Sequence, residues 1–231
     1  MVELKNVDVH YNDGLKGGID ALNDVNIRIN DGEFVFIVGN SGAGKSTLLK
    51  LLTREIQPTS GRVFVNDYNL SKLRNRKLPY FRRGLGMIFQ DFRLIPNLTV
   101  YENVAFVLRA TDQSKKYIRQ RVPYVLNLVK LGEKAKCYPS QLSGGEQQRV
   151  AIARAFACDP KIIIADEPTG NIDPELSYEI VELLKDINEC GTTIIMVTHD
   201  HQIVKHFGGR IINLKNGSVD YDNYIEGEYL L

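Results

Sequence analysis

Apolar and polar residues alternate along the first part of the chain. Residues 2–10 alternate as a strand with one buried face does, and residues 22–29 predict a second strand. Short strands are also expected at residues 61–65 and, near the end of the chain, at 210–214 and 217–221. The strands at residues 2–10 and 22–29 predict that the chain begins with a small β layer.

Unbroken apolar runs follow, and such runs are typical of strands buried on both faces. Three of them occupy residues 34–38, 85–89 and 162–165, and residues 192–197 predict a further strand. Helical patterns lie between them, most clearly at residues 174–190, where apolar residues recur on one face. Strands that alternate with helices predict an α/β fold.

The middle of the chain departs from this alternation. Thr99 followed by Glu102 is the pattern of a capping box at a helix start, and helical, charged sequence continues from there. Residues from about 91 to 159 are therefore expected to form an inserted helical subdomain. Residues 1–90 and 160–231 are expected to form the β layer and core of the same single domain.

A glycine-rich stretch joins the strand at 34–38 to a helix opening at 47–52. Its form, G-x-x-x-x-G-K-S, is that of a phosphate-binding loop. Glycines let backbone N–H groups turn toward phosphate oxygens, and the helix start adds partial positive charge. Lys45 can reach the β- and γ-phosphates, and the Ser46 hydroxyl can ligate Mg²⁺. The residues expected to hold a nucleotide are Gly39, Asn40, Ser41, Gly42, Ala43, Gly44, Lys45, Ser46 and Thr47. A glycine turn with an accidental Lys-Ser is the alternative, and the flanking strand and helix argue against it.

Two acids and a histidine follow later strands. Asp166 can hold Mg²⁺ directly or through water, and Glu167 can orient or deprotonate a water that attacks the γ-phosphate. A helix-capping pair is the alternative for these acids. His199 follows the strand at 192–197 and is expected at the same sheet edge as the loop, where open α/β sheets bind ligands. A structural histidine fits that residue equally well.

Two further positions have both a functional and an ordinary interpretation. Ser143, Gly144 and Gly145 begin an apolar-periodic stretch, where Ser143 can cap a helix whose N-terminus holds an anion. Tyr11, at the end of the first strand, can stack on an adenine, a contact worth roughly 1–3 kcal/mol. An ordinary strand-end tyrosine is an equally good interpretation.

Composition and charge indicate the cellular setting of the chain but say little about its activity. The 231 residues carry a net charge of +1, so no global field selects nucleic acid or a membrane. The three cysteines are far apart and have no metal or redox spacing, and this favours a reducing, cytoplasmic setting. No apolar run approaches the roughly 20 residues that span a bilayer. Any membrane connection is therefore expected to come through a partner.

One local charge run has two interpretations. Within residues 72–83 there are six basic residues and no acidic one: Lys72, Arg74, Arg76, Lys77, Arg82 and Arg83. A solvated basic face is the usual meaning of such a run. The other hypothesis is a face close to anionic lipid headgroups.

The motifs together resemble the ATPase domain of ABC (ATP-binding cassette) systems over nearly the whole chain. The family's motifs are matched, in order, by Tyr11, residues 39–46, Gln90, residues 142–147, residues 162–167, residues 171–173 and His199. The most specific of them is Leu-Ser-Gly-Gly-Glu at 142–146, between the phosphate-binding loop and the two acids. A phosphate-binding loop alone would be weak evidence for this family.

This resemblance implies a fold and a site. The fold would be an α/β P-loop NTPase: an ABC-type nucleotide-binding domain with a RecA-like core, an N-terminal antiparallel β subdomain and an inserted α-helical subdomain. ATP and Mg²⁺ would be the cofactors of an ATP-dependent head-to-tail homodimer. The catalytic residues would be Glu167, His199, Lys45 and Gln90, and the Mg²⁺ ligands would be Ser46, Gln90 and Asp166. Ser143, Gly144 and Gly145 of the facing subunit would close over the γ-phosphate, and Asp173 would join the nucleotide site.

The branch of the family can be narrowed. Residues 168–174 resemble the branch that contains cell-division, lipoprotein-releasing and macrolide-exporter ATPases. In much of the wider family a serine stands where Gly170 does, so a serine contact across the dimer is not implied. Residues 89–106, Arg54-Glu55 and the ending at 227–229 resemble most the FtsE family of Gram-positive bacteria.

This narrower resemblance implies partners and a location. FtsE proteins act with the integral membrane protein FtsX, which would link the chain indirectly to an extracellular peptidoglycan hydrolase. The chain would then be peripheral, on the cytoplasmic face of the cell membrane and at the division site.

Three alternatives stay open at this stage. A lipoprotein-release or macrolide-type exporter ATPase would have the same chemistry and a different partner. A soluble ABC protein acting on DNA or ribosomes would need a long coiled-coil insertion or a second ATPase domain, and the chain has neither. A binding module with an inactive site is disfavoured, because Lys45, Ser46, Asp166, Glu167 and His199 are all present.

Overall fold

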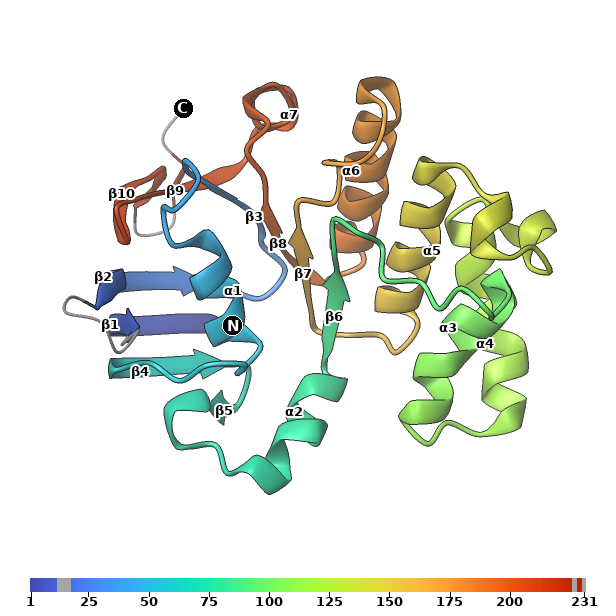
Figure 1. Cartoon of the computed structure of the whole chain (residues 1–231), viewed down its shortest axis with the longest axis horizontal. Coiled ribbons are helices and arrows are strands. Elements are labelled where there is room, and N and C mark those ends of the chain that lie inside the picture. Colours follow the sequence, from blue (N-terminus) through green and yellow to red (C-terminus); the bar gives the residue numbers. More distant parts are fainter. Residues whose placement is uncertain (12–17, 226–227, 230–231) are drawn as a thin grey trace. The chain divides into compact units, whose positions relative to one another are not determined.

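The computed structural model describes residues 1–11, 18–225 and 228–229 (Figure 1). These residues belong to two compact units, Met1–Arg82 with Thr193–Leu231, and Arg83–Thr192. The turn expected at residues 12–17 and most of the tail after residue 225 lie outside the described residues.

Among its described residues, the first unit contains three sets of paired strands and the helix that follows the glycine-rich loop. Its strands are β1 (Val2–Tyr11), β2 (Ile19–Ile29), β3 (Phe34–Val38), β4 (Ser60–Val65), β5 (Tyr68–Asn69), β8 (Thr193–Val197), β9 (Arg210–Lys215), β10 (Ser218–Asp222), β11 (Tyr224–Ile225) and β12 (Glu228–Tyr229). Its helices are α1 (Lys45–Leu52), α2 (Leu78–Arg83, which ends at the unit boundary) and α7 (His201–Phe207), with short 3-10 turns η1 (Leu70–Lys72) and η2 (Asn75–Lys77).

The alternating start of the chain forms the predicted antiparallel layer. Strand β1 pairs with β2 on one side and with β4 on the other, and β5 pairs with β4. Along β1, Val2, Leu4, Val7 and Val9 are buried, and the residues between them are more exposed. The period-two pattern therefore turns one face of this layer inward.

The apolar run at residues 34–38 becomes a strand paired on both sides. Strand β3 runs parallel to β8 and to β9, and β9 pairs with β10 in antiparallel fashion. Val35, Phe36 and Ile37 are fully buried, as expected for a strand covered on both faces. The strands expected at 192–197, 210–214 and 217–221 are confirmed within one residue at each end, and the hairpin of β11 and β12 was not predicted.

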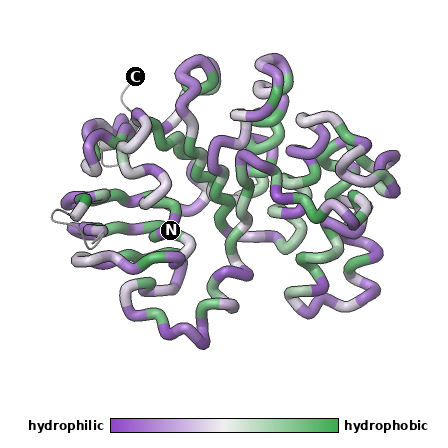
Figure 2. Tube along the Cα trace, in the orientation of Figure 1, coloured by the Kyte–Doolittle hydropathy of each residue, from purple (hydrophilic) through white to green (hydrophobic). Residues whose placement is uncertain are grey.

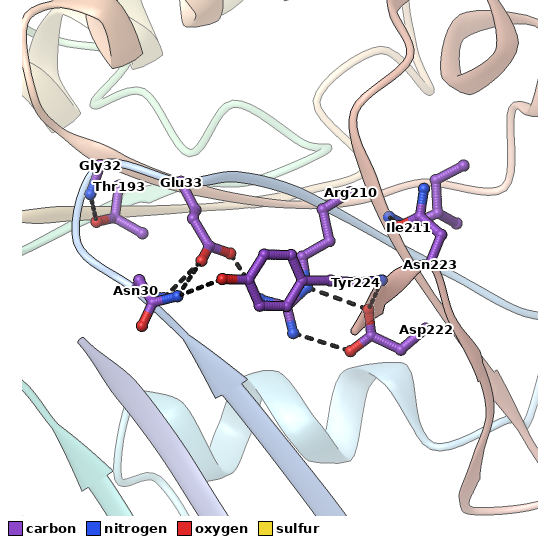
Figure 3. Close-up of polar contacts among 9 residues, drawn as sticks. All are labelled: Asn30, Gly32, Glu33, Thr193, Arg210, Ile211, Asp222, Asn223 and Tyr224. Carbon is purple, nitrogen blue, oxygen red and sulfur yellow. Dashed lines mark hydrogen bonds and ion pairs between the residues drawn. The ribbon is translucent and has the colours of Figure 1, made fainter. Parts of the chain in front are cut away.

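A buried arginine holds the last strands of this unit to β3. The Arg210 side chain is 2% exposed and forms ion pairs with Glu33 at 2.6 Å and Asp222 at 2.8 Å (Figure 3). Its guanidinium carbon also lies 4.5 Å from the centre of the Tyr224 ring. A buried charge is stable only when it is paired in this way. The cluster therefore joins the residue before β3, the start of β9 and the end of β10.

The second unit is mainly helical. Its strands are β6 (Leu85–Ile88) and β7 (Ile162–Asp166), and its helices are α3 (Val100–Ala110), α4 (Lys115–Leu128), α5 (Gly144–Phe156) and α6 (Pro174–Glu189), with 3-10 turns η3 (Gly132–Lys134) and η4 (Pro139–Gln141). Strands β6 and β7 are parallel, with Ile88 opposite Ala165. The helical sequence expected after Thr99 is divided between α3 and α4 by a break at residues 111–114.

The subdomain division expected at residues 90/91 and 159/160 stays a prediction, and the two compact units are bounded at other residues. Strands β6 and β7 and helix α6 group with the inserted helices. Gly86 explains part of this grouping, because a Cβ there would lie 2.8 Å from the Ala155 carbonyl oxygen of α5. Strand β6 is thus packed directly on helix α5, which begins within the Leu-Ser-Gly-Gly-Glu motif at residues 142–146.

Candidate functional site

In the first unit, the phosphate-binding loop connects the end of β3 to the start of α1. Gly39 and Gly44 have φ angles of 148° and 104°, in the region that favours glycine. A Cβ at Gly39 would lie 2.3 Å from the Leu214 carbonyl oxygen, and one at Gly44 would lie 2.7 Å from that of Ala21. Both conformation and space therefore require glycine at these two positions of the motif.

The lysine of the motif, Lys45, donates hydrogen bonds back to the loop that precedes it. The Lys45 ammonium donates hydrogen bonds to the carbonyl oxygens of Gly39 at 2.6 Å and Asn40 at 3.0 Å. Lys45 and Ser46 begin α1, where the first backbone N–H groups have no partner within the helix. These donors and the ammonium make the loop an anion site of the kind that binds phosphates.

His199 lies in the same unit and at the predicted sheet edge. Strands β3 and β8 are parallel with Ile37 opposite Val197, so both end at the same edge. His199 is exposed, two residues beyond the end of β8. The following Asp200 caps α7 through hydrogen bonds from the backbone of Gln202 and Ile203. The predicted placement of His199 beside the loop's strand is confirmed.

Two other features of this unit concern the loop. Tyr11 is the last residue of β1 and is 36% exposed, and its stacking on adenine stays a prediction. A cavity of about 380 Å³ borders residues 39–43. Its other lining residues, which the sequence analysis did not identify, are His201, Asn213, Leu214, Lys215, Asn216 and Asp220.

In the second unit, three predicted residues share the edge of a parallel strand pair. Gln90 follows β6, Asp166 ends β7, and Glu167 comes directly after it. Glu167 has a φ of 46°. A positive φ is uncommon for residues other than glycine, and residues with such strained backbone cluster at functional sites. This conformation had no signal in the sequence.

Gln90 is held by the loop after Glu167. The Asn171 side-chain amide donates to the Gln90 carbonyl oxygen at 2.9 Å, and the Gln90 amide donates to the Asn171 side-chain oxygen at 3.4 Å. A Cβ at Gly170 would lie 2.8 Å from the Gln90 side-chain nitrogen. Asn171 and Gly170 together therefore determine where the Gln90 amide lies.

The expected cap at Ser143 is confirmed, and it is part of a full capping box with Glu146. The Ser143 hydroxyl accepts from the Glu146 amide at 3.3 Å, and the Glu146 carboxylate accepts from the Ser143 amide at 3.0 Å. Glu146 also accepts a hydrogen bond from Lys134, and this bond, followed by that from Ser143, holds the pKa of Glu146 below its usual value. Ser143 itself is exposed at the helix N-terminus.

Helix α5 also supports neighbouring segments of the second unit. Gln148, fully buried, donates to the Pro168 carbonyl oxygen at 2.6 Å, directly after Glu167. Arg154 donates to the carbonyl oxygens of Phe92, at 2.8 Å, and Arg93. Burial, followed by repulsion from Arg93, lowers the pKa of Arg154. Helix α5 thus holds both the segment after Gln90 and the turn after Glu167.

Asn103 organises the next loop. Its side chain is completely buried, and it accepts from the Ile95 amide at 2.8 Å and donates to the carbonyl oxygens of Ile95, Leu98 and Thr99. Asn103 and Arg154 were not predicted as site residues, and Asn171, although within the matched motif at 171–173, was given no role. A polar residue that satisfies backbone groups looks like any surface residue in sequence.

Asp173 begins α6 without capping it. It is the N-cap residue, followed by Pro174, and its exposed carboxylate makes no capping hydrogen bond. Its predicted place in a nucleotide site stays a prediction.

The donors predicted for Mg²⁺ are oxygen ligands, which this cation prefers. They are the Ser46 hydroxyl in the first unit, and the Asp166 carboxylate and Gln90 amide in the second. In the described residues, no group of three or more His, Cys, Asp and Glu side chains could hold a metal. Such a sparse donor set fits a cation that keeps waters and binds substrate phosphates.

Comparison with known proteins identifies the class. The family described as ABC transporter matches residues 22–170, and the chain belongs to that family. A solved dimeric cassette, MJ0796 in a post-hydrolysis state bound to ADP and Pi, is 42% identical with a TM-score of 0.87, covering 99% of this chain and all of that one. The α/β cassette fold and the ATPase class expected from the motifs are confirmed.

Relatives whose names state a role show which members of the family this chain resembles. The chain is 46% identical over 229 residues to the cell division ATP-binding protein FtsE of Bacillus subtilis, across 99% of this chain and 98% of that protein. It is 48% identical to FtsE of Mycobacterium tuberculosis over 96% and 95% of the two chains, and 44% identical to FtsE of Escherichia coli over 90% and 94%. The expected resemblance to FtsE is therefore confirmed. No helix in the described part of this chain has the length and apolarity to cross a bilayer.

Proposed function

We propose that the chain is the ATP-hydrolysing subunit of an FtsE–FtsX-type complex. Two copies would dimerise with ATP, and an FtsX-like integral membrane protein would carry the resulting motion to an extracellular peptidoglycan hydrolase. The observation that carries this proposal is the 46% identity to FtsE over 229 residues, since it includes nearly the whole of both chains. The chain would act at the cytoplasmic face of the membrane, at the division site.

The proposed chemistry is an in-line attack of water on the γ-phosphate. Glu167 acts as the base, and His199 holds the γ-phosphate and the attacking water. Lys45 stabilises the charge that develops on the phosphate oxygens. Bound through Ser46, Gln90 and Asp166, Mg²⁺ would neutralise phosphate charge. In the head-to-tail dimer, Ser143, Gly144 and Gly145 of the facing subunit close over the γ-phosphate, and Asp173 and Tyr11 complete the nucleotide contacts.

Partner docking is proposed for the segment after Gln90. Residues 89–106 carried the resemblance to FtsE, and they are held by Arg154 and Asn103 rather than left loose. Phe106, on α3, is 48% exposed, and few large apolar side chains in the described residues are so open. An exposed aromatic on a rigid helix is a typical anchor for a partner.

The test uses a Glu167→Gln protein to keep ATP bound. This variant should hydrolyse ATP at least about a hundredfold more slowly, since general base catalysis contributes 10²–10⁴-fold. It should also form an ATP-dependent dimer. Glu182→Gln is the matched control, because Glu182 is an exposed acid on α6. Wild-type turnover in Glu167→Gln would remove Glu167 from its role.

The partner is identified by capture from membranes with the same variant and ATP. A partner with four membrane spans, a large extracellular loop and no substrate pathway would support the division role. A partner with a substrate chamber would instead favour the second candidate, a lipoprotein-release or macrolide-type exporter. The similarity to MJ0796, described as a bacterial ABC transporter cassette, keeps that candidate open.

A further inference from the structure

Four of the six basic residues at 72–83 form an exposed surface on the first unit. Lys72, Arg74, Arg76 and Lys77 are all exposed, and they lie on and between the short turns η1 and η2. None of the four is within ion-pair distance of an acidic side chain in the described part of the chain. Their charge is therefore not neutralised locally. Figure 2 draws most of this stretch, between β5 and α2, as hydrophilic.

Arg82, the fifth basic residue of the run at 72–83, has a different role. Arg82 donates to the carbonyl oxygens of Thr53 at 3.1 Å and Arg54 at 3.3 Å. Arg54, nearly buried, donates in turn to the Leu70 carbonyl oxygen at 2.8 Å. These two arginines bind the basic stretch to the end of helix α1. Arg82 is itself exposed, so its hydrogen bonds to the backbone, and not burial, distinguish it from the other four.

Packing makes the stretch a rigid platform. Phe81 is buried and meets the edge of the Tyr68 ring at 5.4 Å between centroids. The Ser71 hydroxyl accepts a hydrogen bond from the Val63 amide at 3.1 Å, and this joins η1 to strand β4. The four basic side chains therefore project from a backbone that is already ordered. Binding would cost the conformational entropy of these four side chains and little backbone entropy in addition.

The chemistry of the outer face points to one kind of partner. Its single exposed large aromatic residue is Tyr80, at 63%. A stable protein interface usually has a buried apolar core. Leu73 and Leu78 are half-buried and Phe81 is buried. The described residues of this face therefore offer little open apolar surface beyond Tyr80 and Pro79. Tyrosine is enriched at the headgroup level of membranes, and clustered Lys and Arg are attracted to anionic lipid. Nucleic acid would need a longer basic stripe than four residues on a chain of net charge +1.

We propose that Lys72, Arg74, Arg76 and Lys77, with Tyr80 beside them, bind the headgroups of an anionic lipid bilayer. The Lys and Arg side chains face the lipid phosphates, and Tyr80 lies at headgroup depth. This contact is independent of any membrane protein, so it does not rest on the proposed FtsX-like partner. It would orient the cassette on the membrane before a partner docks.

The experiment is co-sedimentation of the full chain with protein-free vesicles. Vesicles of phosphatidylcholine are compared with vesicles that also contain phosphatidylglycerol. The test variant replaces Lys72, Arg74, Arg76 and Lys77 by Gln. The control variant replaces Lys115, Lys116, Arg119 and Lys130, four exposed basic residues of the second unit, and so changes the net charge equally. Nucleotide binding and thermal unfolding show that both variants are folded.

The expected result is binding to the anionic vesicles alone, weakened in the test variant and retained in the control. Each basic residue near an anionic surface contributes about fivefold, so four together should give a loss on the order of several hundredfold. Tyr80→Ser should weaken binding further, and added salt should weaken wild-type binding.

Three outcomes would overturn the proposal. The first is no binding of the wild-type chain to anionic vesicles. The second is an equal loss in both four-residue variants, because net charge alone would then be responsible. The third is unchanged vesicle binding in the test variant together with lost capture of a membrane protein, which would assign this surface to an acidic protein segment instead.

Discussion

Glu167 combines a strained backbone with a predicted catalytic role. Its φ of 46° is maintained by the turn that follows, where the Gly170 amide donates to the Glu167 carbonyl oxygen at 3.1 Å. Gln148 holds the next carbonyl, that of Pro168. Non-glycine residues in this region persist only where the surroundings determine them. The turn from Glu167 to Gly170 therefore fixes the direction of the proposed base.

Gly170 packs against the Gln90 side chain, and this contact predicts what a substitution at Gly170 would do. In Gly170→Ala the new methyl group would displace the Gln90 amide, which lies 2.8 Å away. The amide is the far end of a flexible side chain, so we expect unfolding free energy to change by less than about 1 kcal/mol. Because small misplacements in a site are costly, turnover should fall about tenfold. Steady-state ATPase assays and urea unfolding measure the two effects.

A double-mutant cycle with Gln90→Ala provides the control. If Gly170 acts through Gln90, Gly170→Ala should have little further effect on turnover in the Gln90→Ala protein. Equal losses in both backgrounds would show that Gly170 acts elsewhere, for instance through the Glu167 turn.

At the scale of elements, α5 is the scaffold of the second unit's site. Arg154 holds the carbonyl oxygens of Phe92 and Arg93, two residues with φ angles of 56° and 48°. Arg154→Gln should lower the free energy of unfolding by about 2–4 kcal/mol, because charged hydrogen bonds are worth roughly 1.5–3 kcal/mol each. Urea unfolding gives this value, and hydrogen exchange should show loss of protection near residues 92–95.

Arg149 on the same helix is the matched control. It pairs with Glu179, whose side chain is 53% exposed, so Arg149→Gln should cost less than about 1 kcal/mol. Similar costs for the two arginines would contradict a specific role for Arg154 in holding the segment after Gln90.

The same helix predicts a pH dependence. The pKa of Glu146 is lowered by hydrogen bonds from Lys134 and Ser143. A carboxylate with a depressed folded-state pKa stabilises the fold above its unfolded pKa of about 4.3, and this contribution disappears as pH falls through the folded value. Glu146→Gln should therefore be destabilised at neutral pH, by roughly 0.3–1 kcal/mol, and should match the wild type in strong acid. A pH series of unfolding midpoints checks this, and a difference that persists in acid would contradict it.

The elements were largely predictable because each has a local signal. Alternation gave β1, apolar positions gave β2, and apolar runs gave β3, β6, β7 and β8. A capping box located the start of α3, and the capping residue Ser143 located the start of α5. Motif residues such as Lys45 and Glu167 were predicted because their chemistry requires particular side chains. The roles of Asn171 and Arg154 were missed, because their partners are backbone carbonyls distant in sequence. The role of Asn103 was missed because its partners, although near in sequence, lie in an irregular loop whose path the sequence does not predict. Such contacts depend on the fold and leave no pattern.

At the scale of the whole molecule, the predicted catalytic residues belong to two compact units. The loop, with Lys45 and Ser46, and His199 belong to the first unit, whereas Gln90, Asp166, Glu167 and Ser143 belong to the second. In the proposed dimer, a second copy would contribute its Ser143 to the nucleotide. ATP would then stabilise the closed dimer by binding it better than the open chains.

Ser143 allows a test of this dimer that keeps the helix cap. Asp and Asn both cap helices as well as serine does, so Ser143→Asp and Ser143→Asn should preserve the start of α5. They differ in one negative charge, which would face the γ-phosphate of the other copy. In the Glu167→Gln background with ATP, Ser143→Asn should dimerise, and Ser143→Asp should dimerise at least about a hundredfold more weakly, because opposed like charges cost several kcal/mol. Sedimentation measures dimerisation, and ATP affinity of the monomers should be equal. Equal dimerisation of the two variants would mean that Ser143 does not face the phosphate.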